Sequence, residues 1–455
     1  MRNGLGVLAF RVRFVHDRGM ARSYRGGDRS QLLLLPPDLD DWLPGDHFAR
    51  FVADVVTRLD LSGFERSQRD DGRGRRAYAP AMMLGVVFLA WCSGERSSRR
   101  IERLCIESIP FRWITGNEVP DHTTISRFVQ GRPEAIEGLF TQVLELVQRA
   151  GVLRTDVVFV DGTKIGADAS PLASLSRDRL RQEAARIRGA HAARDDADDA
   201  ALGARRGDEL PGELADPAGR GARIEENLRQ MQAEDDAAAA AHEQHLAARK
   251  GSGGRPPKPP APTQRQGNVT DPDARTMKTP RGFGPSYNAQ AVVTSDQIVV
   301  AVDVTQDRSD NHLLAPMTQA AAAALGVVGA DRPRRVVADA GYWNDTISDQ
   351  SGDGCEQLVP APPNRHRTAI ATRGPIPAGA SRAQRMQRKL ALKANKATYA
   401  KRKTTVEPVF GQIKAVLGIR RFRRRGLDAV RNEWCLIATV HNLRKLWMLE
   451  RLQLA

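Results

Sequence analysis

Three carboxylates occupy positions from which they could hold metal ions for phosphodiester chemistry: Asp161, Asp339 and Glu407. Phosphodiester cleavage needs charge neutralisation around the phosphorus. A pair of Mg²⁺ ions about 3.5–4 Å apart, held by carboxylates, is a common solution. Mg²⁺ prefers oxygen ligands, which favours Asp and Glu over Cys. Two or three such carboxylates must converge from separate elements of the fold.

The two aspartates share one local pattern. The segments VVFVDG and RVVADAG each place mainly apolar residues before Asp161 and Asp339 and a small residue after them. This pattern predicts two buried strands that each end in an aspartate. The alternative, for either one alone, is an aspartate that begins a turn after a strand. Asp303, followed by Asp307 and Asp310, is a competitor. Because Asp303 lies in an alternating valine pattern with no small residue after it, we interpret it as a non-catalytic strand position.

The third carboxylate lies in the segment TTVEPVFGQIK. The spacing of Thr404 and Glu407 matches a capping box, and Pro408 is tolerated in a first helical turn, so both predict a helix start here. On this local pattern alone, helix capping explains Glu407 better than catalysis does. Lys414 lies two helical turns further on, and we expect it to project along the same edge as Glu407. A carboxylate and a cation so placed could hold metal and DNA phosphate together.

The chain is strongly basic, and its excess charge lies near the C-terminus. The formal net charge of the 455 residues is +15. Residues 381–455 contain 19 Lys and Arg against 4 Asp and Glu, which equals that whole excess. A solvated basic tail is one interpretation, but the charges alternate with apolar residues at helical spacing, which indicates a folded segment. We therefore expect a polyanionic partner, most often nucleic acid.

Several classes of protein are excluded. No apolar run approaches the roughly 18–20 residues that cross a bilayer. The first residues, MRNGLGVLAFRVRF, contain only a short apolar run broken by arginine, which argues against a signal peptide. Met20 is a candidate alternative start. The cysteines form no C-x-x-C pair, so we expect reduced thiols in a cytoplasmic protein. They are Cys92, Cys105, Cys355 and Cys435.

Periodicity divides the chain into four parts. Residues 1–30 are predicted to be disordered or a misassigned start. Residues 31–153 show helical apolar spacing and predict a helical N-terminal domain. Residues 154–169 and 281–455 alternate strands and helices, as a mixed α/β domain does. Residues 170–280, rich in alanine and charge, predict a helical insertion, in one interpretation an antiparallel pair, followed by a Pro/Gly linker. Four arginines of the N-terminal part are candidate phosphate contacts, with solvated helix faces as the alternative: Arg99, Arg100, Arg103 and Arg127.

In this order, the segments VDGTKI, VVADAGYW and VEPVFGQIK resemble the DDE transposases of bacterial insertion sequences. The segments PDHTTISRF, YNAQAVV and EWCLIATVHNLRKL are similar to that family too. The resemblance covers most of residues 30–170 and 280–450. It implies a helical DNA-binding domain and an RNase H-like catalytic domain. It also implies Mg²⁺, with Mn²⁺ as a substitute, and binding to the inverted repeats of the element.

By position, Asp161, Asp339 and Glu407 match the catalytic and metal-binding triad of that family. Many relatives add a tyrosine, an arginine and a lysine around the third carboxylate, which here are Tyr399, Arg402 and Lys414. Arg402 has four residues before Glu407 where the family pattern usually has three. Either Arg402 is displaced by one residue or Lys403 takes its place.

The resemblance implies hydrolysis at the element ends, which frees a 3′-OH that then attacks target DNA. The expected DNA contacts are Tyr399, Arg402 or Lys403, Lys414, and basic helices over residues 420–426 with Arg420, Arg421, Arg423, Arg424 and Arg425. Two ends must be joined together, so a homodimer or larger assembly on DNA is expected, in the cytoplasm at the bacterial nucleoid. Two alternatives remain. One is a metal-dependent nuclease without strand transfer. The other is an inactive DNA-binding remnant, which the insertion suggests because it is atypical of the family.

Overall fold

The computed structural model describes residues 38–65, 77–202, 219–249, 257–344, 347, 354–364 and 368–454. The predicted start segment, Met20 and part of the Pro/Gly linker lie outside these residues. The fold is a mixed α/β structure with a helical N-terminal region, which confirms the predicted fold class. Within the described residues, no helix is both long and apolar enough to span a membrane.

The N-terminal region consists of short helices packed around the apolar helix α4. Buried residues fill every position of α4 from Met83 to Cys92, and Gly94, with φ of +82°, follows its end. The amphipathic helices around it turn their apolar faces inward. A short turn at residues 131–132 separates α7 from α8. The bounds are α1 (Leu39–Trp42), α2 (Phe48–Thr57), α3 (Ser62–Glu65), α4 (Pro80–Cys92), α5 (Ser98–Glu107), α6 (Ile109–Thr115), α7 (His122–Gln130) and α8 (Pro133–Arg149).

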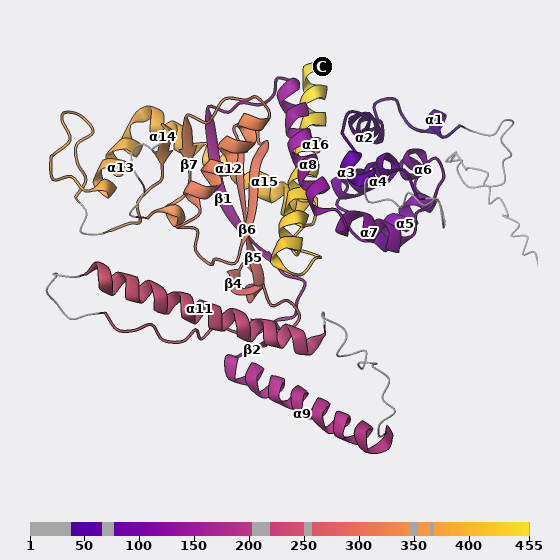
Figure 1. Cartoon of the computed structure of the whole chain (residues 1–455). Helices are drawn as coiled ribbons and strands as arrows, with labels where there is room; N and C mark the ends of the chain where they lie inside the picture. Colours follow the sequence, from indigo (N-terminus) through magenta and orange to yellow (C-terminus); the bar gives the residue numbers. More distant parts are fainter. Residues whose placement is uncertain are drawn as a thin grey trace, which may run out of the picture.

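A six-stranded mixed sheet forms the centre of the molecule (Figure 1). Its path runs β4-β5-β1-β7-β8, and β6 also pairs with β5. β5 is antiparallel to β1, β4 and β6, whereas β1, β7 and β8 are parallel. This mixed sheet agrees with the RNase H-like fold that the resemblance implied. The strands are β1 (Val157–Gly166), β4 (Arg275–Thr279), β5 (Gly282–Thr294), β6 (Val299–Thr305), β7 (Arg335–Val337) and β8 (Glu356–Leu358).

Helices cover both faces of this sheet. On one face, the core includes Phe159 of β1, the long helix α16 and the N-terminal helices. On the other face, Val158 and Val160 pack with α12 in a second core. Figure 1 shows α16 and α8 between the sheet and the N-terminal helices. The remaining elements here are α12 (Leu314–Val327), the short helix η2 (Ala340–Tyr342), α13 (Arg382–Ala391), α14 (Lys393–Ala400), α15 (Arg402–Gly411), the π-helical turn η3 (Gln412–Val416) and α16 (Leu427–Leu454).

The N-terminal helices and the mixed α/β part share buried polar contacts as well as a core. Arg96 donates to Glu433 of α16 at 2.6 Å, and both side chains are buried. Cys92 donates its thiol hydrogen to the Val440 carbonyl at 3.5 Å. All four cysteines are buried and free. The two parts of the chain therefore pack directly against each other at α4 and α16.

Residues 170–280 contain two long helices below the sheet (Figure 1), α9 (Arg177–Leu202) and α11 (Arg220–Ala248). Arg177 near the start of α9 pairs with Asp235 of α11, and Arg188 pairs with Glu225, so the helices run antiparallel. They enclose only a small separate core. Short elements flank the pair, and β4 already belongs to the main sheet although it precedes residue 281. These elements are η1 (Pro171–Ala173), β2 (Ser174–Leu175) and β3 (Gly267–Asn268).

Candidate active site

Asp161 lies in the middle of β1 and not at its end, so the predicted strand end is wrong. β1 continues to Gly166 because β5 pairs with it over that whole length. The neighbouring strand β7 stops earlier, at the pair of Phe159 with Val337. Asp161 is therefore just beyond the last residue of β1 that β7 covers. Because β7 ends early, β1 has no neighbouring strand on this edge at Asp161 within the described residues. The prediction had instead explained the accessibility of Asp161 by an end of β1.

Asp339 follows β7 by two residues and begins the short helix η2. Its Oδ1 accepts a hydrogen bond from the Gly341 N–H at 2.8 Å. A Cβ on Gly341 would be 2.9 Å from that oxygen, so a larger residue here would require the Asp339 side chain to shift. The predicted combination of a short strand and an aspartate after it is confirmed for Asp339.

The surroundings of Asp161 are unfavourable to its negative charge. Burial raises the pKa of Asp161 to about 6, and the nearby charges of Asp339 and Asp310 raise it too. The Arg402 guanidinium and the N–H of Gly162 act in the opposite direction. Negative charge is thus concentrated where β1 passes the end of β7. A cation at this place lowers the free energy of the ionised carboxylates.

Glu407 is not a helix cap. α15 begins at Arg402, directly after α14, so Thr404 already lies in the first turn and its hydroxyl donates to the Lys401 carbonyl at 3.1 Å. Pro408 lies inside the helix and cannot donate to the Thr404 carbonyl, as position i−4 requires. The side chain of Gln297, from the turn between β5 and β6, donates to that carbonyl instead, at 3.1 Å. This external donor explains how the helix tolerates its proline.

Arg402 joins two of the three predicted carboxylates. Its Nη1 lies 3.2 Å from Asp161 Oδ2, and its Nη2 lies 3.3 Å from Glu407 Oε1. Lys403 is exposed. Of the two candidates that the sequence left open, Arg402 is therefore the one that contacts the carboxylates. It reaches them because α15 starts at Arg402 and faces β1 with its first turn.

Lys414 and Tyr399 flank this bridge. Lys414 lies in the π-helical turn η3, and its Nζ donates to Thr163 Oγ1 and, at 3.1 Å, to the Lys164 carbonyl of β1. Burial lowers its pKa, as does the charge of Arg420, whereas Asp161 raises it. Tyr399 is half-buried, which raises the pKa of its hydroxyl; Arg402 lowers that pKa.

The basic segment 420–426 is not helical but consists of bends around a single bridge at Arg421, so the predicted helix is wrong. Its backbone runs alongside the end of β1, where the Gly166 N–H donates to the Arg420 carbonyl at 3.2 Å. Glu433 accepts the N–H groups of Arg423 and Arg424, each at 2.9 Å, and buried Phe422 anchors the segment. These contacts outcompete helical hydrogen bonds.

Not all predicted DNA-binding arginines are free. Arg420, Arg421 and Arg423 are exposed. By contrast, Arg424 donates to Asn432 Oδ1 at 2.8 Å, and Arg425 pairs with Asp168 at 2.9 Å. In the N-terminal region, the four candidate arginines are exposed: Arg99, Arg100, Arg103 and Arg127.

Sequence reasoning missed the polar residues behind Asp161. Asp310 accepts from Asn288 at 2.6 Å, from Gln290 at 2.9 Å and from Lys164 at 3.3 Å. The sequence pattern had marked Asp310 only as a competitor. The buried strand sequence YNAQ offered a signal for its role, because two amides in a central strand need partners.

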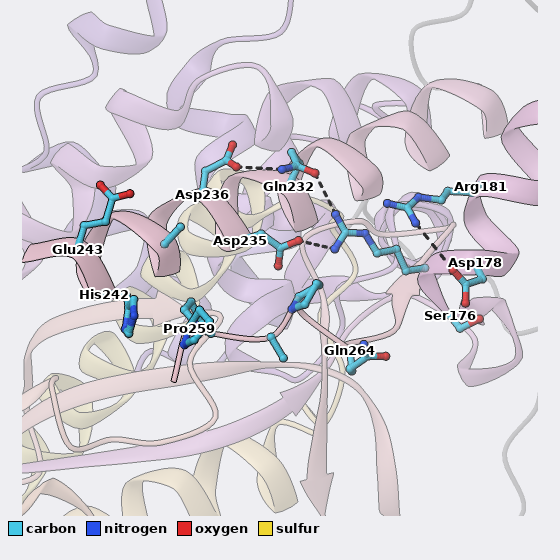
Figure 2. A pocket seen from close by; sticks show the side chains of 15 residues that line it. Ser176, Asp178, Arg181, Gln232, Asp235, Asp236, His242, Glu243, Pro259 and Gln264 are labelled. Atoms are coloured by element: carbon cyan, nitrogen blue, oxygen red, sulfur yellow. Dashed lines mark hydrogen bonds and ion pairs between the residues drawn. The ribbon is translucent and has the colours of Figure 1, made fainter. Parts of the chain in front are cut away.

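A pocket elsewhere lies between α9, α11 and residues 259–264 (Figure 2). Its charged side chains pair with one another: Arg177 with Asp235, and Arg181 with Asp178 at 3.9 Å. Gln232 donates to Asp236 at 2.9 Å. The Arg177–Asp235 pair joins the two helices, and Asp235 Oδ1 also accepts from the Thr263 N–H at 2.6 Å, which holds the proline-rich segment to α11. None of the predicted catalytic residues lines this pocket.

Among the residues that the structure describes, no three His, Cys, Asp or Glu side chains are grouped closely enough to hold a metal ion. The donor set nevertheless fits a hard divalent cation in kind, because it consists of carboxylate oxygens with negative charge concentrated around Asp161. The Arg402 guanidinium lies between Asp161 and Glu407, where it supplies positive charge. Metal binding by these carboxylates therefore requires Arg402 to move.

Comparison with known families gives two matches. Residues 37–131 match a family described as a transposase domain (DUF772). Residues 263–443 match the transposase DDE domain (DDE_Tnp_1), a range that includes Asp339 and Glu407. No curated protein and no solved structure matches the chain. The two family matches together cover more than half of the sequence, and the chain belongs to the DDE transposases of insertion sequences.

Proposed function

We propose that this DNA transposase binds the terminal inverted repeats of its insertion sequence, cleaves phosphodiester bonds at the element ends with Mg²⁺, and joins the freed 3′-OH to target DNA. Asp161, Asp339 and Glu407 carry this activity. The observation that supports it most strongly is the convergence at Arg402: carboxylates from β1 and α15 meet one guanidinium, and Asp339 is close enough to raise the pKa of Asp161.

A divalent ion bound by these carboxylates would act as a Lewis acid on the attacking and leaving oxygens. Asp161 and Asp339 lie on rigid elements, a paired strand and a capped turn, which suits fixed ligands. Glu407 is half exposed and sits on α15, so of the three carboxylates that would hold the ion it is the one least fixed by its surroundings. Arg402, released from the carboxylates, would hold a DNA phosphate with its planar fork.

Lys414 is positioned to contact the backbone of the same DNA strand. It reaches β1 two residues beyond Asp161, where the hydroxyl of Thr163 and the carbonyl of Lys164 hold it. Tyr399 lies beside Arg402 and would stack on a base or contact a phosphate. Lys403, exposed on the same turn, would add a screened charge alone.

A pocket between the two halves of the chain has a basic lining that suits contact with the phosphates of a duplex lying over it. It is lined by Arg99, His122, Arg423 and Arg424 among other residues, from α5, α7 and the basic segment. Such a basic lining favours phosphate contacts, which fix the position of a duplex. We propose that Arg99, Arg100, Arg103 and Arg127, with Arg420, Arg421 and Arg423, supply these contacts, and that at least a dimer acts on the bacterial chromosome.

The test is cleavage of a labelled duplex from the ends of the element that encodes the chain. Asp161→Asn, Asp339→Asn and Glu407→Gln should each abolish Mg²⁺-dependent nicking and still bind the duplex. Asp303→Asn is the matched control, because Asp303 is a strand aspartate paired with Arg431 at 3.0 Å on a different strand, β6. Equal nicking by the three site variants and the wild type would refute the assignment.

The same assay separates the alternatives. A circular target plasmid added to the reaction should become covalently joined to the labelled end. Nicking without any joined product would favour a nuclease. Binding of the ends without Mg²⁺-dependent nicking would favour an inactive DNA-binding remnant. The paired carboxylates and the ordered bridge between them favour the active enzyme.

A further inference from the structure

Behind Asp161, on the α12 face of the sheet, lies a buried side-chain amide that contacts several of the elements around the site. Gln290 is fully buried in β5, and it pairs in register with Gly162, the residue after Asp161. Its backbone carbonyl accepts from Trp434 Nε1 of α16 at 2.8 Å. Backbone contacts alone therefore hold Gln290 in place in the sheet, independently of its side chain.

The side-chain amide of Gln290 uses all of its groups on neighbours of the site. Nε2 donates to Asn288 Oδ1 and to Asp310 Oδ1, both at 2.9 Å, and Oε1 accepts from the Tyr342 hydroxyl. The orientation of the amide is determined, since a carboxylate can only accept and Nε2 must therefore face Asp310. An apolar residue would fill this space without needing partners.

These contacts connect the two aspartates of the site. Tyr342 is the last residue of η2, the short helix that Asp339 begins and caps. On the other side, a Cβ on Gly162 would collide with Gln290 Nε2, so the amide lies directly against the backbone next to Asp161. One end of the turn is held by Asp339 itself and the other end by Gln290.

We propose that Gln290 is a positioning residue, which sets the separation of Asp161 and Asp339 by holding the η2 turn through Tyr342 and the Asp310 loop through Nε2. The inference rests on the proposed function, because the separation has a use only where the two aspartates act on one cation site. Asp310, which accepts from Gln290 Nε2, also forms an ion pair with Lys164 of β1.

Mn²⁺ binding to the full-length chain without DNA tests this role, with free Mn²⁺ measured by electron paramagnetic resonance. Loss of a residue that orients metal ligands typically lowers affinity about 10–100-fold. Gln290→Met keeps the bulk and removes the hydrogen bonds, so we expect a loss of about tenfold or more. Tyr342→Phe removes only one hydroxyl, which makes it the milder variant if Gln290→Met does not fold, and we expect a loss of about fivefold.

The double variant provides a readout that a merely structural role would not give. Because Tyr342 acts through Gln290, Gln290→Met with Tyr342→Phe should bind Mn²⁺ no more weakly than Gln290→Met alone. Asn442→Leu is the matched control. Asn442 is an equally buried amide whose oxygen and nitrogen both contact Val299, at 2.9 and 2.7 Å, away from the aspartates. It should lower the melting temperature and leave Mn²⁺ affinity unchanged.

Wild-type affinity in Tyr342→Phe, or full additivity in the double variant, would overturn the positioning role and leave the proposed function standing. A wild-type chain that neither binds Mn²⁺ nor nicks DNA with Mg²⁺ would overturn the proposed function, and the positioning role with it. The two failures are therefore distinguishable.

Discussion

Replacement of Arg402 by glutamine should make the transposase bind divalent metal more tightly while it loses activity on DNA. In the structure, the Arg402 guanidinium lies against Asp161 and Glu407, so a metal ion must displace it to reach both. The glutamine side chain would be uncharged and too short to span the two carboxylates. The substitution therefore removes a competitor for the site.

The size of the effect follows from the two contacts. Hydrogen bonds that involve a charged group contribute about 1.5–3 kcal/mol net. The separation of 3.2 Å between Arg402 and Asp161, whose side chains are 15% and 16% exposed, argues for the lower end of this range. The contact with Glu407, which is 48% exposed, adds about 0–1 kcal/mol because water screens it. Since about 1.4 kcal/mol corresponds to a factor of ten, we expect Mn²⁺ affinity to rise about tenfold.

Isothermal titration with Mn²⁺ in the absence of DNA measures this change. Lys403→Gln is the control, because it removes the same charge from the adjacent residue, which is exposed and does not bridge the carboxylates. Its affinity for Mn²⁺ should stay within about twofold of the wild type, since solvent and salt screen that charge. In parallel, Arg402→Gln should lower the salt dependence of DNA binding by about one phosphate contact.

The reasoning fails if Arg402→Gln binds Mn²⁺ no more tightly than the wild type does. In that case the guanidinium would not compete for the metal, and its contacts would serve only to hold α15 against β1. A gain of equal size in Lys403→Gln would point instead to a general effect of charge, without a role for the bridge.

Three further predictions concern stability. Arg96→Met should cost about 3–5 kcal/mol in urea unfolding, because it removes the ion-pair partner of buried Glu433, whereas Arg58→Met, at an exposed ion pair with Asp54, should cost about 0–1 kcal/mol. Burial lowers the pKa of His441 to about 4, below its unfolded value of 6.5, so the folded state binds fewer protons. Stability should fall by about 3 kcal/mol as pH drops from 6.5 to 4, and His441→Gln should flatten this dependence. Gly162→Ala should destabilise by about 1–3 kcal/mol because its Cβ meets Gln290, whereas Gly138→Ala, with open space around it, should not; a thermal melt compares them.

Much of the fold could be predicted because it follows from local periodicity. The helical N-terminal part, the strands that lead to Asp161 and Asp339, and the helical pair of the insertion were all predicted from apolar spacing or local composition. Their positions along the chain agree with the structure within a few residues. What periodicity cannot give is where a neighbouring strand ends. That is why Asp161 was placed at the end of β1, although the early end of β7 is what exposes it.

The error at Glu407 has a different physical origin. The spacing of Thr404, Glu407 and Pro408 is that of a helix start, and each local rule was applied correctly. A donor from elsewhere, Gln297, bonds the Thr404 carbonyl that Pro408 leaves without a partner, which allows the helix to begin earlier. A contact between residues 107 positions apart leaves no trace in a local pattern. The earlier start is also what places Arg402 on the first turn, beside both carboxylates.

The arginine-rich segment illustrates how charge in a sequence and charge on a surface differ. The sequence suggested five phosphate contacts between Arg420 and Gly426. In the structure, however, Arg424 donates to Asn432 and Arg425 forms an ion pair with Asp168. Arg424 lies where α7, α8 and α16 meet, and buried Glu433 holds the adjacent backbone together with Arg96 of the N-terminal region. Part of the positive charge of this segment therefore orders the junction between the two halves of the transposase. The exposed arginines beside this junction are therefore attached to a well-packed backbone. A fixed backbone is what a basic surface needs in order to hold a DNA end at a constant position relative to the carboxylates.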